Sequence, residues 1–166
     1  MRRSLIALLV LAMAGTCGCG LLRAKKQPMN LKDCAGLSAA LEKAELAESV
    51  KGKVLVVLFW TRYNPHFSMQ TLPHMKALYA NYKDSGLEIV LVNTDRSSNP
   101  DEAADFLARE RVNFANILDD GSIGKDFAFR DEPIIFDRNG NHVKAGSHTS
   151  DTVAFDKKID ELTGEK

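Results

Sequence analysis

The central apolar run of this chain reads Val54-Leu55-Val56-Val57-Leu58-Phe59-Trp60, and the polar stretch Thr61-Arg62-Tyr63-Asn64-Pro65-His66-Phe67 follows it at once. Seven consecutive apolar residues, rich in valine and aromatic side chains, predict a strand that is buried on both faces. A helical pattern begins near Ser68. The polar stretch is therefore expected to be a short turn between a buried strand and a helix, a place where α/β folds carry functional residues.

The segments around this run alternate between helical and strand patterns. A strand, a helix and a second strand of these lengths predict a parallel pair joined by a right-handed crossover. An interior proline, Pro73, is expected to kink the helix after the turn. The expected elements are a helix at 33–50, a helix from 68 to about 83, a strand at 87–93, a helix from Pro100, a segment at 112–119, a hairpin of 134–136 and 142–145 around Asn139-Gly140, and a last helix at 150–162 that packs Val153, Ile159 and Leu162.

Several of these segments resemble the TlpA/ResA-type branch of the thioredoxin-like proteins, which is related to the AhpC/TSA group. Its members read F-W-x-x-W-C-P-P-C where this chain has Phe59-Trp60 and Pro65. Residues 112–119 resemble the family's V-x-F-P-V-L-x-D, and 127–133 resemble its Y-G-V-x-x-x-P. The resemblance covers roughly residues 53–146. It implies an α/β thioredoxin-like three-layer sandwich, in which helices flank a mixed sheet of parallel core strands and a C-terminal β-hairpin.

The resemblance also implies two cysteines in the turn, but this chain has cysteines only at 17, 19 and 34. Counting from Phe59-Trp60 places the lost cysteines at Asn64 and Phe67, whereas counting back from Pro73 places them at Pro65 and Ser68. One residue has therefore been inserted in the turn. Thiol–disulfide exchange needs an attacking thiolate and a resolving thiol. The turn is thus a degenerate active site, made of Asn64, Pro65, His66, Phe67 and Ser68.

The resemblance assigns a further feature to the segment before the hairpin. Pro133 is expected to be the cis-proline that faces the turn, with Glu132 as its neighbour. His66 and Glu132 could form a general acid–base pair, although an exposed turn histidine is the favoured interpretation. His66, Met69 and His74 could bind copper, because periplasmic copper sites use histidine and methionine. We favour Met69 in the core and His74, His142 and His148 on the surface, and we expect no metal and no cofactor.

The amino terminus has the pattern of an export signal. Arg2-Arg3 precede an apolar segment at 5–14, which is too short to span a membrane. Small residues around Cys17 and Cys19 resemble a bacterial lipobox, with Cys19 lipidated and Cys17 as the alternative. Cleavage after Ala14 by ordinary signal peptidase would instead release a soluble product. We expect a signal peptide at 1–18, a tether at 19–32 and a domain at 33–166, anchored by lipid on the outer side of a bacterial cell membrane.

Composition limits the function. Twenty-two basic and 22 acidic residues balance, which gives no sign of a nucleic-acid partner. The sequence predicts a redox-inactive module, rather than an enzyme, that binds a protein or peptide partner in the groove between the turn and Pro133. Two alternatives stay open: a TlpA/ResA-type thiol–disulfide oxidoreductase that uses Cys34, perhaps with Cys19, and a copper-handling protein. Cys34 itself is expected to be a small, partly buried apolar residue.

Overall fold

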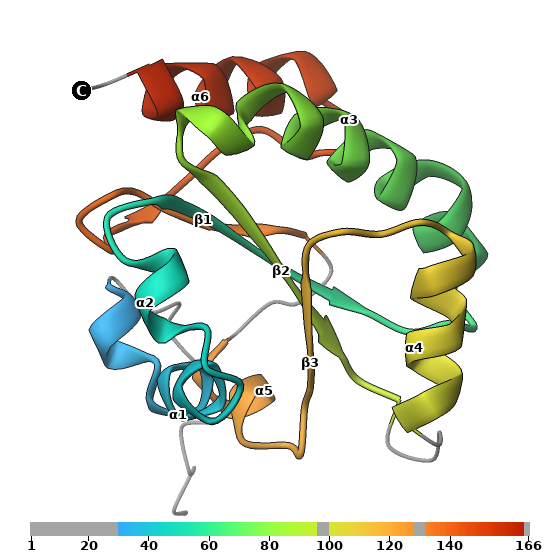
Figure 1. Cartoon of the computed structure of the whole chain (residues 1–166). Helices are drawn as coiled ribbons and strands as arrows, with labels where there is room; N and C mark the ends of the chain where they lie inside the picture. Colours follow the sequence, from blue (N-terminus) through green and yellow to red (C-terminus); the bar gives the residue numbers. More distant parts are fainter. Residues whose placement is uncertain (1–29, 96–99, 128–131, 165–166) are drawn as a thin grey trace, which may run out of the picture.

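The computed structural model describes residues 30–95, 100–127 and 132–164. The expected signal peptide, both candidate lipidation sites and most of the expected tether lie outside the described residues. Figure 1 shows the arrangement of the elements. In chain order these are η1 (Leu31–Asp33), α1 (Ala35–Lys43), α2 (Ala47–Val50), β1 (Val54–Trp60), η2 (Phe67–Thr71), α3 (Leu72–Tyr82), η3 (Lys83–Ser85), β2 (Leu87–Asn93), α4 (Pro100–Arg109), β3 (Ala115–Leu118), α5 (Ile123–Asp126), β4 (Ile134–Phe136), β5 (His142–Val143) and α6 (Thr152–Gly164).

A five-stranded mixed sheet forms the middle layer, in the order β3-β2-β1-β4-β5. β1 pairs in parallel with β2, and β2 pairs in parallel with β3. β4 runs antiparallel to β1 and forms a hairpin with β5. The expected parallel core strands, C-terminal hairpin and flanking helices are therefore confirmed. β1 lies at the centre of the sheet and every residue except Phe59 is buried, as the apolar run predicts.

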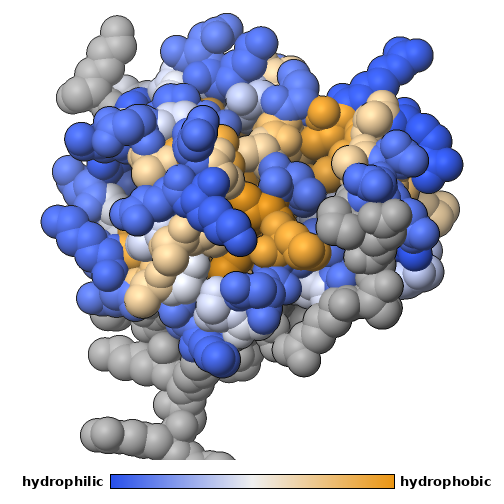
Figure 2. All heavy atoms as spheres, turned by 60° about the horizontal axis from the view of Figure 1, so that its bottom comes forward, coloured by the Kyte–Doolittle hydropathy of each residue, from blue (hydrophilic) through white to orange (hydrophobic). Residues whose placement is uncertain are grey.

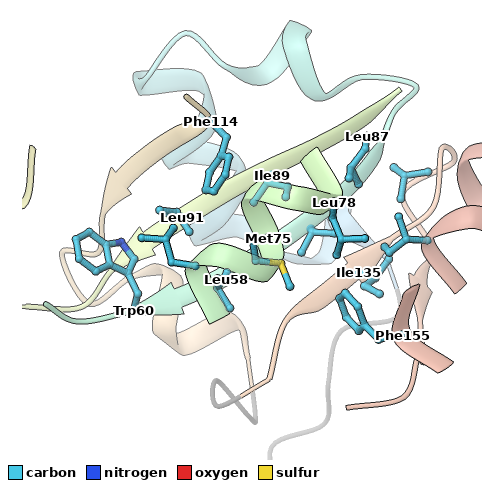
Figure 3. Close-up of a cluster of buried hydrophobic side chains, with 14 of the residues drawn as sticks. Leu58, Trp60, Met75, Leu78, Leu87, Ile89, Leu91, Phe114, Ile135 and Phe155 are labelled. Carbon is cyan, nitrogen blue, oxygen red and sulfur yellow. The ribbon is translucent and has the colours of Figure 1, made fainter. Parts of the chain in front are cut away.

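Alternate residues of β1 pack into two cores on opposite faces of the sheet. Val54, Val56, Leu58 and Trp60 join α3, α4 and α6 in one core, which Figure 3 shows around Met75 and Phe155. On the other face, Leu55 and Val57 join residues of α1, α2 and α5. Figure 1 shows α3 and α6 above the sheet and α1, α2 and α5 below it.

The expected helix at 33–50 is broken into α1 and α2. Glu45 has a φ of 58°, which an α-helix does not tolerate. The amide of Leu46 donates to the carbonyl of Leu41 at 2.8 Å, a bond from residue i to i−5 that closes a helix at its C-terminus. The chain then turns into the four-residue helix α2. Described residues at the start of the chain also pack, because the amide of Leu31 donates to Gly140 in the hairpin turn at 2.7 Å.

The helix after β1 contains a π-helical turn, η2, which ends two residues before Pro73. In this turn the amide of Leu72 donates to the carbonyl of Phe67, five residues back. A π turn holds one residue more than an α turn and is frequent at functional sites. Its length is consistent with the extra residue that the two sequence registers indicate.

The last helix differs from its prediction in one contact. Ile159 and Leu162 are buried, but Val153 is 79% exposed, so its expected packing was wrong. Val153 lies in the first turn of α6, whereas Phe155 takes the core position there.

Among the described residues, no helix is long and apolar enough to cross a membrane.

The face that carries α1 has a hollow between α1 and the edge strand β3. Its cavity measures about 430 Å³ and its lining includes Ala39, Ala40, Ile117 and Leu118. Figure 2, turned so that this side comes forward, shows hydrophobic side chains gathered amid hydrophilic ones. Its lining has one cation, Lys43, and one carboxylate, Asp120, and is otherwise mostly small or aliphatic. The hollow therefore offers apolar contact rather than a set of catalytic groups.

Candidate functional site

The turn at the carboxyl end of β1 opens a capped helix. Asn64 accepts a hydrogen bond from the amide of His66 through its side-chain oxygen at 3.1 Å. Residues 65 and 66 are helical, so Asn64 is the N-cap and Pro65 is the first helical residue. Asn and Pro are both favoured at these positions, and the local sequence is therefore sufficient to start the helix.

Antiparallel pairing brings the segment before β4 to the same end of the sheet. Ile134 lies beside Val57 of β1, so Glu132 and Pro133 lie towards the end at which β1 enters the turn. The described residues contain no cis peptide bond, and the expected cis bond before Pro133 is therefore wrong. The trans isomer is the intrinsically favoured one, and Glu132 is held by bonds to the segment before α6.

A chain of four polar side chains crosses this end of the molecule. Glu132 Oε2 lies 2.6 Å from Nδ1 of His148, and Nε2 of His148 lies 3.1 Å from the hydroxyl oxygen of Thr71. The same hydroxyl lies 3.4 Å from Nδ1 of His66. Ser147 donates to the other carboxylate oxygen of Glu132 at 2.7 Å. The chain thus joins η2, the segment before β4 and the segment before α6.

Charge and burial set the protonation of this chain. His148 is only 5% exposed, and burial lowers its pKa, while the hydrogen bond and charge of Glu132 oppose that shift only in part. Burial would raise the pKa of Glu132, but the hydrogen bonds from Ser147 and His148 outweigh it and the net pKa is lowered. At neutral pH this gives a carboxylate beside a neutral imidazole. Because a carboxylate only accepts, the proton of His148 is on Nδ1, and Nε2 accepts from the Thr71 hydroxyl.

A small polar cavity opens onto the chain. It measures about 160 Å³, and Asn64, His66, Thr71, His148 and Thr149 line it together with Leu58, Phe59 and Phe67. Thr71 is 4% exposed. The hydroxyl of Thr71 and the two imidazoles therefore meet at one hollow.

The structure separates most of the residues that the sequence suggests could act together. His66 is exposed, as expected, but Glu132 bonds to His148 rather than to His66. Met69 is 77% exposed, which corrects its expected place in the core. His74 pairs with Asp156 of α6 at 2.7 Å. Of the copper candidates, Met69 is thus exposed and His74 is already paired. No group of three or more His, Cys, Asp or Glu side chains in the described part of the chain could hold a metal.

The remaining turn residues have structural roles. Phe67 is buried and stacks on Trp60 with ring centroids 5.0 Å apart. The hydroxyl of Ser68 donates to the carbonyl of Pro65 at 3.1 Å. Arg62 points to α4, where its guanidinium pairs with Glu102, and it also contacts the Tyr63 hydroxyl. The two positions that sequence counting gives for the second cysteine, Phe67 and Ser68, therefore supply no nucleophile to the cavity: Phe67 lines it with an aromatic ring, and Ser68 is not in its lining.

Sequence reasoning missed Thr71 and His148, and its surface placement of His148 was wrong. His148 is buried because its ring packs edge-on against Phe155 and bonds on both sides. The two residues are 77 positions apart. No motif or spacing rule joins them, so only the fold reveals the contact.

Cys34 lies on the other face of the sheet, in the core that includes Leu37 and Val57. Its side chain is fully buried, and it forms no disulfide with any described residue. Burial, with the nearby carboxylates of Asp126 and Asp33, raises its pKa to about 12. Because the thiolate is the reactive form, this thiol is unreactive in the folded state.

Comparisons with known proteins agree with the fold. A thiol–disulfide oxidoreductase ResA from Halalkalibacterium halodurans is 30% identical over 155 residues, which cover 87% of this chain and 83% of that protein. A solved structure from Chlorobium tepidum, assigned as a thiol:disulfide interchange protein DsbE, has a TM-score of 0.60 and 27% identity over 70% of this chain and 84% of its own. A solved protein disulfide isomerase candidate from Bacteroides thetaiotaomicron has a TM-score of 0.60 and 20% identity, covering 71% and 78%.

The ResA and DsbE relatives are thus named as thiol–disulfide proteins, and the fold of the chain is the thioredoxin-like fold that it shares with the DsbE structure. The match to the family itself is also long. Residues 26–159 match the AhpC/TSA family, which is most of the 166 residues. The chain belongs to the AhpC/TSA family, with relatives of the ResA and DsbE type.

Proposed function

We propose that this chain binds extended polypeptide at the surface around its turn and exchanges no disulfide there. The observation that carries the proposal is that two large apolar side chains are exposed around a turn that has no thiol. Tyr63 is 68% exposed and Met69 is 77% exposed, and the sequence has no cysteine after Cys34. Exposed aromatic and methionine side chains are typical of interaction surfaces.

The shape of the turn supports the same proposal. The N-capped helix and the central strand fix the turn rigidly, and the polar cavity beside it supplies hydrogen-bonding groups. Rigid apolar contacts next to polar groups give affinity and orientation together. A member of this family can in this way keep a binding surface after losing its thiols.

The proposal is tested by fluorescence anisotropy with a labelled polypeptide, the carboxamidomethylated insulin B chain. The full chain should bind it, and Tyr63→Ala with Met69→Ala should weaken binding at least about tenfold, the equivalent of 1.4 kcal/mol. Val153→Ser is the matched control, because Val153 is equally exposed but lies on α6. Equal affinity in all three proteins, or no binding, contradicts the proposal.

A second candidate function is thiol–disulfide exchange through Cys34, perhaps with Cys19. The named activities of the ResA and DsbE relatives favour it, whereas the burial and raised pKa of Cys34 oppose it. Insulin-disulfide reduction by the full chain and by Cys34→Ser separates the two candidates. Turnover that disappears in Cys34→Ser supports exchange and overturns the first proposal, and turnover absent from both proteins rejects the second.

We also propose that the chain is exported and anchored by lipid at Cys19, with Cys17 as the alternative. The support is the basic, apolar and small-residue pattern at 1–20. Membrane fractionation of Cys19→Ala and Cys17→Ala is the test. The protein should leave the membrane fraction only in Cys19→Ala, and membrane retention in both variants rejects a cysteine anchor.

A further inference from the structure

The order of groups in the polar chain is that of an activated nucleophile. A hydroxyl, an imidazole and a carboxylate follow one another, with Thr71 Oγ1 3.1 Å from His148 Nε2 and His148 Nδ1 2.6 Å from Glu132. Both distances are within hydrogen-bond reach for a nucleophile, a base and the group that orients the base. Such triads are recognised by geometry and roles rather than by sequence order.

The protonation states suit the same roles. His148 is neutral near neutral pH, because burial lowers its pKa, and Glu132 is ionised. Glu132 holds the proton on Nδ1 and leaves the lone pair of Nε2 directed at the Thr71 hydroxyl. A neutral imidazole in this tautomer can remove a proton from that hydroxyl.

The cavity limits what can reach the hydroxyl. Its volume of about 160 Å³ suits a group no larger than a short acyl chain. Asn64 and His66 also line it and carry N–H donors that can stabilise negative charge on a carbonyl oxygen. An ester with a small acyl group is therefore the substrate class that fits.

We propose that Thr71, His148 and Glu132 form an acyl-transfer site that acts on esters of short carboxylic acids. The Thr71 oxygen bonds to the carbonyl carbon while its proton moves to Nε2 of His148. The bond to the leaving oxygen then breaks, and His148 returns the proton to the departing alcohol. Water releases the acid by the same route, giving its proton to His148, which restores the Thr71 hydroxyl. The reaction needs no thiol, no metal and no bound polypeptide, so it goes beyond the proposed function although it uses the same cavity.

The test uses p-nitrophenyl acetate and the full chain in which Cys17 and Cys19 are serine and Cys34 is alanine, so that no thiol reacts. We expect nitrophenol release with an acetyl group on Thr71, located by peptide mass mapping. Thr71→Val, which preserves the shape, should abolish the adduct, and Thr71→Ser should retain it. His148→Gln should slow acylation at least about a hundredfold, while His142→Gln, in the hairpin, should not.

Glu132 acts through His148, so its role has a separate readout. Glu132→Gln removes a charge that raises the pKa of His148, and the midpoint of the pH–rate profile should therefore move to lower pH. An unmoved midpoint would show that Glu132 is only structural. An adduct on another residue, or equal rates in Thr71→Ser, Thr71→Val and His148→Gln with all three folded by circular dichroism, overturns the proposal.

Discussion

Cys34 and Thr71 each carry a potential nucleophile, they lie on opposite sides of the sheet, and their surroundings differ in kind. Cys34 is enclosed by aliphatic and aromatic side chains with carboxylates beyond them, which raises its pKa to about 12. Thr71 is equally buried, yet it contacts two imidazoles and a cavity. The thiol of Cys34, intrinsically the better nucleophile, is therefore inert, whereas the less reactive hydroxyl of Thr71 lies beside the imidazole of His148. Environment, rather than residue type, determines where chemistry is available in this fold.

The largest effect that this contrast predicts is on thiol labelling. In the chain with Cys17→Ser and Cys19→Ser, Cys34 should react with a thiol reagent in the folded state at least about a thousandfold more slowly than in urea. The pKa rises from 9.0 to about 12, which lowers the thiolate fraction by roughly that factor, and burial slows access further. Fast labelling in the folded state would show that Cys34 is accessible and would revive its candidacy for exchange.

The next effect is on stability, at the other face of the sheet. Glu132→Ala leaves the N–H of buried His148 without its acceptor, and should lower the free energy of unfolding by about 1–3 kcal/mol in urea titrations. Glu132→Gln retains an acceptor oxygen and should cost less. Glu161→Ala is the control, because the solvent-exposed ion pair of Glu161 with Lys158 should contribute little to stability. Equal losses in Glu132→Ala and Glu161→Ala would mean that the polar chain adds nothing to stability.

A third effect concerns pH. His148 has a lowered pKa in the folded state, so as the pH falls below about 6.5 the unfolded chain binds the proton first. The stabilisation is full above that pH and is lost as the pH falls through the folded pKa. His142 contributes in the same direction, because burial and Lys144 lower its pKa too. Unfolding measured at pH 7.5 and 5.5 should show a loss that is smaller in His148→Gln and smallest in the double variant with His142→Gln. A loss of unchanged size in both variants contradicts this assignment.

These contrasts also show which parts of the molecule the sequence reveals. The buried strands were predictable because short apolar runs rich in valine and isoleucine are typical of strands buried on both faces. The inserted residue was visible as a conflict between two registers. The π turn η2, which holds one residue more than an α turn, lies between the two sequence anchors that conflict. The break at Glu45 was not visible, since it depends on a positive φ in a segment whose composition favours helix.

The candidate site was predictable only in its location. The turn after β1 was identified from the strand and the helix start. Its chemistry, however, depends on the contact of Thr71 with His148, 77 positions later, and on the bond of His148 to Glu132. The polar sequence around His148 predicts an exposed loop, but the arrangement of β4, β5 and α6 packs this residue against Phe155. Pairings of this kind arise from topology, and local patterns do not encode them.

The smallest effect separates the outer surface of the turn from the buried polar chain beneath it. Tyr63 and Met69 are mostly exposed, so replacing either with alanine should change the free energy of unfolding by no more than about 0.5 kcal/mol. Met75→Ala should cost about 2–5 kcal/mol, because Met75 is fully buried in the core of α3. Replacing Tyr63 or Met69 should therefore affect polypeptide binding without affecting folding. The free energies of unfolding of Tyr63→Ala, Met69→Ala and Met75→Ala, measured by urea titration, check this. A large loss in Tyr63→Ala or Met69→Ala would mean that these side chains serve the fold, and any loss of binding would then follow from unfolding rather than from a lost contact.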